Sequence, residues 1–433
     1  MKDKKTSPAC SIDVLQLQVG MYVHLDLGWM AHPFARSSFR IASQEQIEII
    51  RSLGLAQVRW DPVRSDTGAA PEAAPPAAAP GAPSAGPAVD DAARARQARR
   101  ELLAAQQASL AACEREFAQA GRVHRQVLEQ VQSDPEGARR SSEQLIGGFL
   151  DCLGRGGDIC IRLLGETSGD RAAGHAINVT VVALLLGKAC GLEQAELHEL
   201  GLGALLHDIG KVELPDRVRW RSDHLSPVEL QFYQEHVAHG LDLARRMQLG
   251  LGAALIIAQH HEHADGSGFP QRLSGPRIAH AARIVALVNR YDNLCNHPNP
   301  ARALTPHEAL SLMFAQMKQR FDASLLNAFI KMMGVYPPGS VVQLGDDRYA
   351  LVASVNPARP LKPRVIVHDP GVPREDALLL DLEALPALGI RRSLKPAQLP
   401  QAARDYLAPR QRVSYFFEPP ASASLAGCER MAA

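Results

Sequence analysis

His207 and Asp208 place an imidazole and a carboxylate side by side at the end of an apolar stretch, GALLHDIGK at 203–211. Adjacent residues on an α-helix point about 100° apart, so these two side chains cannot both pack into one core. Both can instead bind an ion, or a pair of ions, held against the helix end. The alternative is an ordinary helix C-terminus, with the histidine near the last carbonyls and Gly210 ending the helix. This short pattern alone leaves the two interpretations about evenly matched.

More histidines in neighbouring apolar segments favour the metal interpretation. Neutral imidazole and carboxylate are ligands that suit iron, manganese or zinc. One metal takes about four protein ligands or fewer, so six candidate ligands predict two metals, with Asp208 as the ligand that both share. Such a centre can activate a bridging water as hydroxide and clamp a phosphoryl group for in-line displacement. The further histidines are His175 in GHAINV, His236 in EHVAHG, and His260 and His261 in QHHEH.

Residues near these histidines have the chemistry to contact a phosphate. Lys211 follows Asp208 by one helical turn and can meet a substrate phosphate. Gly266 and Gly268 in DGSGFP would let a backbone loop approach a ligand closely. A single histidine is more often a packed residue than a ligand. For the set, spaced across successive helices, we expect metal binding.

Three motifs, HDIGK at 207–211, HHEHADGSGFP at 260–270 and YDNL at 291–294, resemble those of the HD-GYP family, a branch of the HD phosphohydrolases. The resemblance runs from about residue 165 to 336. It implies an all-helical domain that binds two or three metals, iron or manganese, and hydrolyses the bacterial second messenger cyclic di-GMP to the linear dinucleotide or to GMP. The first 63 residues also resemble a small module of unknown function that precedes many bacterial HD-GYP domains.

The resemblance also implies roles for individual residues. Asp208 and Lys211 would be catalytic, and Lys211 would contact a phosphate. The signature loop, whose usual tyrosine is Phe269 here, would bind substrate through Asp265, Gly266 and Gly268, with Arg302 beyond it. The implied metal ligands are His175, His207, Asp208, His236, His260, His261 and Asn289.

The chain departs from the family pattern in three ways. Asn289 stands where the family has an aspartate ligand, so one negative charge is lost and metal affinity should fall. Arg171 replaces the glutamate of three-metal members, so we expect at most two metals. Pro298 and Ala301 replace basic residues that hold the dinucleotide phosphates, which leaves Arg302 nearby.

Three functions therefore stay open. The first is a two-metal phosphodiesterase that hydrolyses cyclic di-GMP. The second is a phosphohydrolase acting on another nucleotide or phosphoester. The third is a degenerate HD-GYP protein that binds metal or nucleotide without turnover and acts as a signalling protein or scaffold.

The elements that must position these residues are mainly helical. Apolar runs at helical spacing, separated by turn signals, predict a helical bundle over 170–336. We expect a multidomain, mainly α protein, with a small α+β module at 1–63 and an Ala/Pro-rich linker at 64–90. An HD-GYP-like helical domain at 91–336 would begin with long helices over 91–133 and shorter helices over 134–166. Residues 337–433 would form a β-rich C-terminal module with a loose tail.

The overall composition of the chain limits the classes of partner that it could bind. The net charge of +1 gives no electrostatic case for a nucleic acid polymer. The apolar run at 177–192 is interrupted by Lys188 and is short for a membrane span, and no apolar signal segment follows the N-terminus. We therefore expect a cytoplasmic protein. Its helices over 91–133 would pair across a homodimer or, with equal weight, pack on their own domain.

Overall fold

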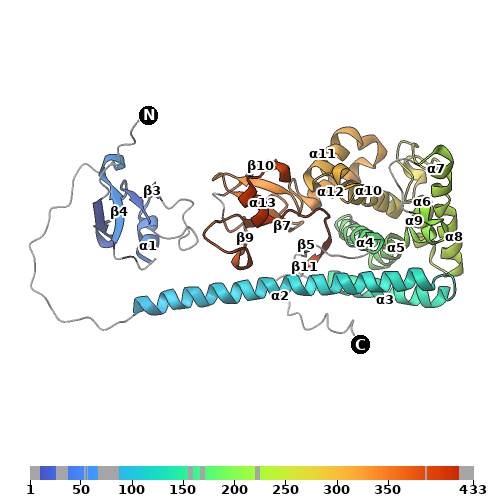
Figure 1. Ribbon diagram of the computed structural model, residues 1–433, viewed down its shortest axis with the longest axis horizontal. Coiled ribbons are helices and arrows are strands. Elements are labelled where there is room, and N and C mark those ends of the chain that lie inside the picture. Colours follow the sequence, from blue (N-terminus) through green and yellow to red (C-terminus); the bar gives the residue numbers. More distant parts are fainter. Residues whose placement is uncertain are drawn as a thin grey trace, which may run out of the picture. The chain divides into compact units, whose positions relative to one another are not determined.

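The computed structural model of the 433-residue chain describes residues 10–25, 38–52, 55, 57–66, 87–154, 159–165, 171–219, 225–385 and 388–418 (Figure 1). The expected signal-free N-terminus, most of the expected linker (67–86) and the tail (419–433) lie outside these residues. The chain divides into two compact units, Met1–Leu102 and Leu103–Ala433.

The N-terminal unit is the α+β module that the sequence predicted. Its four-stranded sheet has the order β1-β4-β2-β3, and every pair is antiparallel. Helix α1 contributes Ile47 and Ile50 to a small core that also contains Val23 and Trp60. The elements are β1 (Cys10–Asp13), β2 (Tyr22–His24), β3 (Ser38–Arg40), α1 (Gln44–Ser52) and β4 (Gln57–Asp61).

Two long helices precede the ligand-bearing helices. Helix α2 (Pro87–Gln130) ends in a turn, and α3 (Pro135–Gly154) begins at a proline, the residue that suits a first helical position. Side chains of α2 and α3, among them Phe117 and Phe149, belong to one hydrophobic core of this chain. Pairing of α2 across a homodimer stays a prediction.

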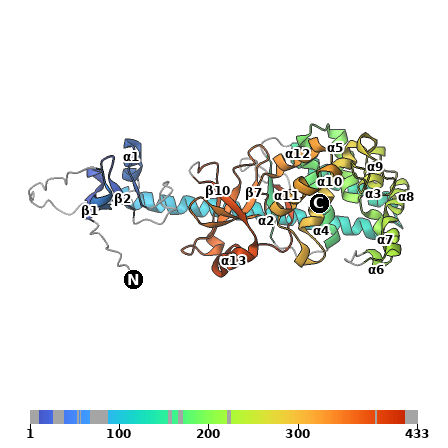
Figure 2. The same cartoon turned by 90° about the horizontal axis from the view of Figure 1, so that it is seen from above.

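The helical bundle has an unusually apolar centre in α4 (Arg171–Ala189). Among the described helices this is the one long and apolar enough to cross a membrane, but 72% of its apolar window is buried inside the protein. Helices α6, α7 and α8 lie together at one end of this unit in both views (Figures 1 and 2). The other helices are α5 (Gln194–Leu206), η4 (Ile209–Glu213), α6 (Asp216–Arg219), α7 (Pro227–Gln234), α8 (His236–Arg246), α9 (Leu251–Gln259), η5 (Gly275–Arg277), α10 (His280–Cys295), η6 (Pro300–Arg302), α11 (Pro306–Gln316), η7 (Lys318–Arg320) and α12 (Ala323–Met333).

The C-terminal residues form the β-rich region that the sequence predicted, but not from residues 337–433 alone. The path of the sheet is β10-β6-β7-β5-β11, and β8 and β9 continue from β7. Strand β5 (Cys160–Leu163) comes from the region where we expected only helices, so that expectation was wrong. Its residues are buried, and its backbone pairs with strands 194 and 252 positions further along the chain (Ile161 with Val355, Leu163 with Tyr415), partners that local pattern cannot reveal. The other strands are β6 (Val341–Leu344), β7 (Tyr349–Val355), β8 (Arg364–Val367), β9 (Leu379–Asp381), β10 (Ile390–Leu394) and β11 (Tyr415–Glu418). One helix, α13 (Gln401–Leu407), lies between β10 and β11 in the sequence.

Candidate metal centre

Gly210 brings two parts of the site together. A Cβ built at this position would lie 2.0 Å from the carbonyl oxygen of His236 and 2.3 Å from the backbone nitrogen of Gly240. Only glycine permits this approach of η4 to α8. The glycine of the HDIGK motif is therefore a packing requirement, and it puts Asp208, at the start of η4, beside His236, at the start of α8.

The first candidate metal group consists of His175 on α4, His207 at the end of α5, and Asp208. The Nε2 atoms of the two histidines are 3.2 Å apart. Oδ2 of Asp208 lies 3.4 Å from Nε2 of His207 and 3.8 Å from Nε2 of His175. All three ligand atoms thus surround one small volume.

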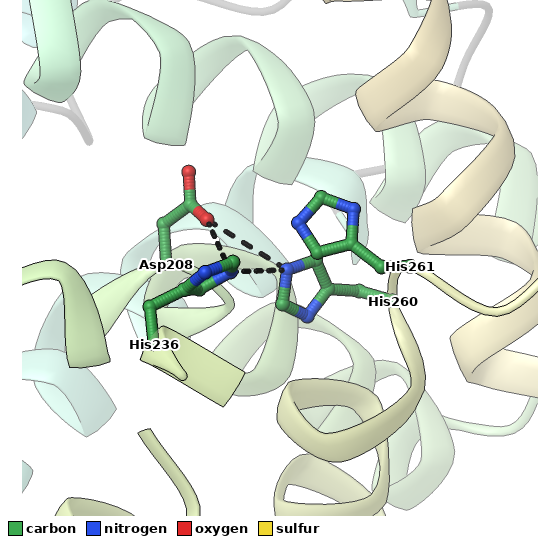
Figure 3. Close-up of side chains that lie close together, drawn as sticks. All are labelled: Asp208, His236, His260 and His261. Atoms are coloured by element: carbon green, nitrogen blue, oxygen red, sulfur yellow. Dashed lines mark hydrogen bonds and ion pairs between the residues drawn. The ribbon is translucent and has the colours of Figure 1, made fainter. Parts of the chain in front are cut away.

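The second candidate group consists of Asp208, His236, His260 and His261, with ligand atoms within 4.8 Å of one another (Figure 3). Here the other carboxylate oxygen is used: Oδ1 of Asp208 lies 3.5 Å from Nε2 of His236 and 3.7 Å from Nε2 of His260. One oxygen of Asp208 therefore faces each group. This is the arrangement expected of a ligand shared by two metals.

Backbone carbonyls orient three of the imidazoles. Nδ1 of His207 donates to the oxygen of Ala204 at 2.7 Å. Nδ1 of His236 donates to Tyr233 at 2.5 Å, and Nδ1 of His260 donates to Ile257 at 2.9 Å. Because a carbonyl only accepts, each of these rings carries its proton on Nδ1 and turns the Nε2 lone pair toward Asp208.

Bare Nε2 atoms facing one another repel, yet His236 and His260 hold theirs 3.5 Å apart. A cation between them would turn this repulsion into coordination. Within the described residues, Oδ1 of Asp208 and Nε2 of His261 are buried atoms that make no hydrogen bond. Buried polar atoms are rarely left without partners. The donor set therefore fits divalent metals with imidazole and carboxylate ligands.

The site's electrostatics favour the protonation state that metal binding requires. Burial lowers the pKa of His236 to about 3, with Asp208 offsetting only part of the effect, and burial also lowers the pKa values of His207 and His261. Burial alone would raise the pKa of Asp208, but Lys211 and His207 outweigh it and hold this pKa well below its usual range. Neutral imidazoles and an ionised carboxylate need lose no proton to a metal.

Asp292 has a role that sequence reasoning missed. In the sequence it stood out only as part of the YDNL motif. Oδ2 of Asp292 instead accepts a 2.6 Å hydrogen bond from Nδ1 of His175, and Oδ1 accepts from Asn178 and Asn296. A carboxylate behind a ligating histidine orients the ring and raises its basicity. No local signal in the sequence pairs Asp292 with His175, because the two residues lie 117 positions apart.

Asn289 is buried on α10. Its side-chain oxygen accepts a 2.5 Å hydrogen bond from the amide of Asn293, one turn further along the helix. That bond occupies part of the oxygen's acceptor capacity. Its role as a metal ligand stays a prediction.

The signature loop folds back on the second metal group. A Cβ on Gly268 would lie 2.4 Å from the carbonyl oxygen of His261, so the loop backbone packs directly on the backbone of the histidine pair. The ring of Phe269 stacks on His261, with centroids 4.4 Å apart. Glu262, another residue that sequence reasoning missed, is buried and accepts hydrogen bonds from the backbone of Gln271 and Leu273.

Asp265 and Gly266 shape the same loop. Oδ1 of Asp265 accepts from the backbone of Ser267 at 2.9 Å, and Gly266 has a φ of 77°, which favours glycine. Their contact with substrate, like that of Gly268, stays a prediction.

Lys211 and Arg302 were the two residues expected to contact a phosphate, and the structure places Lys211 beside the metal groups. Nζ of Lys211 lies 2.5 Å from Oδ2 of Asp208 and 5.3 Å from the ring centre of Tyr233. Asp208 raises the pKa of Lys211 against the lowering effect of burial, so the ammonium stays charged. Arg302 is exposed in η6, close in sequence to the exposed Pro298 and Ala301, and its phosphate contact stays a prediction.

The histidines and the aspartate of this cluster lie within a segment that matches a known protein family. Residues 160–325 match the model of the HD domain family, and residues 9–141 match that of a domain of unknown function, DUF3391. Cyclic di-GMP phosphodiesterase PA4108 of Pseudomonas aeruginosa is 28% identical over 361 residues, which cover 82% of this chain and 84% of that protein.

Two further relatives match over shorter lengths. Cyclic di-GMP phosphodiesterase response regulator RpfG of Xanthomonas campestris pv. campestris is 34% identical over 155 residues, 35% of this chain and 40% of that protein. 3'3'-cGAMP-specific phosphodiesterase 2 of Vibrio cholerae is 29% identical over 168 residues, 38% of this chain and 32% of that protein.

Proposed function

The chain belongs to the HD domain family, in its HD-GYP branch, and from this premise we propose that it is a metal-dependent phosphodiesterase that hydrolyses cyclic di-GMP. The observation that carries the proposal is Asp208, whose two carboxylate oxygens face two separate groups of histidines. A site for two cations at one carboxylate suits phosphodiester hydrolysis. The phosphodiester is negatively charged, and further negative charge develops on the leaving oxygen in the transition state, where cations would stabilise it.

The cofactors in this proposal are two divalent metals, iron or manganese. His175 and His207 would hold one, His236, His260 and His261 would hold the other, and Asp208 would bind both. The metals would supply Lewis acidity to the phosphodiester and to the water that attacks it. Oriented Nδ1–H bonds keep the imidazoles in place, so little reorganisation is needed when cations bind.

Lys211 has a separate role. In the structure its ammonium neutralises Asp208. A cation bound at Oδ2 of Asp208 would repel that ammonium and release it toward the substrate. We propose that Lys211 then contacts a non-bridging phosphate oxygen.

The identity of the substrate has one specific alternative. Pro298 and Ala301 stand where basic residues are expected for cyclic di-GMP, and one relative is named a 3'3'-cGAMP-specific phosphodiesterase. Both dinucleotides share the cyclic phosphodiester ring and differ in one base. A non-catalytic signalling role is the further alternative, and the lost charge at Asn289 favours it.

The test is hydrolysis by protein purified anaerobically and loaded with iron or manganese. Cyclic di-GMP, 3'3'-cGAMP and a simple chromogenic phosphodiester would be compared, with His207→Ala and Asp208→Ala as blanks. We expect turnover of cyclic di-GMP that disappears in both blanks. Turnover of 3'3'-cGAMP alone would reassign the substrate. Loss of all turnover in a protein with metal bound would favour the non-catalytic role.

A further inference from the structure

Two asparagines hold the backbone just before strand β11. Nδ2 of Asn178, on α4, donates to the carbonyl of Val413 at 2.9 Å, while its oxygen accepts from the backbone nitrogen of Tyr415 at 2.9 Å. Asn296, at the end of α10, donates to the same Val413 carbonyl at 2.9 Å and accepts from the Val413 nitrogen at 2.9 Å. Each amide thus serves the segment as both donor and acceptor, as another strand would.

The same two amides also support a metal ligand. Asn178 and Asn296 donate to Oδ1 of Asp292 at 2.8 and 2.9 Å. Oδ2 of Asp292 accepts from His175, which belongs to the first metal group. Asn178 and Asp292 are fully buried, so water does not compete for these bonds. A displacement of the backbone at 413–415 would therefore move the carboxylate that orients His175.

The other side of the segment packs on the long helices. Phe416 contacts Phe117 of α2 and Phe149 of α3, with ring centroids 6.3 and 5.6 Å apart. Cys113 of α2 donates its Sγ–H to the carbonyl of Phe417 at 3.3 Å. Residues Val413–Glu418, called here the C-terminal strap, therefore lie between α2 and the residues that orient His175.

We propose that the C-terminal strap positions the His175 metal group through Asn178, Asn296 and Asp292, and so links metal affinity at that group to the packing of α2. Asn178, Asn296 and Asp292 are positioning residues, because they act on the metal through His175. The inference rests on the metal site of the proposed function but not on its substrate. Loss of a partner behind a ligating histidine typically costs about 10- to 100-fold in metal affinity.

The strap acts on one of the two groups only, and this gives the test its selectivity. His236, His260 and His261 take their orientation from their own backbone and from the signature loop. A loss of general stability would weaken both metals. A loss of positioning at Asp292 would weaken the metal at His175 alone.

The first experiment titrates metal-free full-length protein with Mn²⁺ and follows unbound Mn²⁺ by electron paramagnetic resonance. His175→Ala identifies the binding step that belongs to the first group. We expect Asn296→Ala to weaken that step about tenfold and leave the other within about twofold. The matched control is Thr180→Val, since Thr180 is a buried polar residue on α4 whose hydroxyl donates to the carbonyl of Ala176 within the same helix.

The second experiment needs no variant. Coupling between two sites is reciprocal, so if the strap supports metal binding, metal must stabilise the strap. The backbone nitrogens of Val413 and Tyr415 donate to the asparagine side chains, and their hydrogen exchange reports on these bonds directly. We expect Mn²⁺ to slow exchange of both amides severalfold in the wild type and to have no such effect in His175→Ala.

The outcomes separate the two proposals. Unchanged Mn²⁺ binding in folded Asn296→Ala, or strap exchange that does not respond to metal, overturns the inference. If Asn296→Ala does not fold, the exchange experiment on the wild type decides alone. If both effects are observed but the wild type hydrolyses no cyclic dinucleotide, the proposed function is contradicted and this inference is supported.

Discussion

Nδ1 of His175 lies 2.6 Å from Oδ2 of Asp292, and this bond joins α4 to α10 directly behind the first metal group. Asp292 is itself held by two amide donors, so its orientation is determined before any metal binds. The aspartate of the YDNL motif therefore supports a candidate metal ligand, His175.

Replacing that support without changing its shape should weaken one metal. In Asp292→Asn the amide oxygen can still accept from His175, but the negative charge that raises the ring's basicity is gone and the amide nitrogen faces the donors of Asn178 and Asn296. We expect about tenfold weaker Mn²⁺ binding at the His175 step, measured by the titration described above. Asp242→Asn, at an exposed carboxylate on α8, is the matched control. An equal loss of Mn²⁺ affinity at both binding steps would contradict the assignment of Asp292 to the His175 metal group.

Restoring the carboxylate at position 289 should have the opposite effect. Asn289→Asp adds one negative charge on α10, where the family ligand is expected. We predict tighter Mn²⁺ binding, by about tenfold, and a higher rate on cyclic di-GMP. Asn293→Asp adds the same charge one turn away and should increase Mn²⁺ affinity and the rate on cyclic di-GMP less. If the two variants behave alike, the effect is general electrostatics and Asn289 is no ligand.

The glycine of HDIGK should be intolerant of any side chain. A methyl group at Gly210 would overlap the backbone of His236 and Gly240, and such overpacking typically costs about 1–3 kcal/mol, with more expected against backbone that cannot move aside. Gly174→Ala is the control, because a Cβ there meets nothing within 4 Å and α4 should gain up to about 1 kcal/mol. Urea unfolding measures both. Equal stabilities would mean that η4 and α8 do not pack as described.

The metal-free protein should lose stability as the pH falls below about 6.5. The pKa of His236 in the folded protein is about 3. Between about pH 6.5 and pH 3 this histidine is therefore protonated in the unfolded chain but neutral in the folded protein. The free energy of unfolding then falls by up to about 1.4 kcal/mol per pH unit for this residue. Thermal unfolding with a chelator from pH 8 to pH 5 tests it. The slope should be shallower in His236→Gln, and an identical slope would show that His236 titrates normally.

Local sequence determined the parts of this protein that depend on neighbours in the chain. The spacing of apolar residues predicted the helices of the bundle, because a helix buries residues three and four apart. Short motifs located His207, Asp208 and the histidine pair, because a metal needs these donor types whatever the fold. The α+β module and the β-rich C-terminal region also followed from pattern and turn residues.

Tertiary structure alone decided which residues meet across the chain. Strand β5 was missed because its four residues become a strand only by pairing with β7 and β11. Asp208 could be named as a shared ligand from sequence, but the division of its two oxygens between two groups required the approach of α8 at Gly210. Asp292 and the C-terminal strap could not be foreseen at all, since hydrogen bonds between residues 117 positions apart leave no local signal in the sequence.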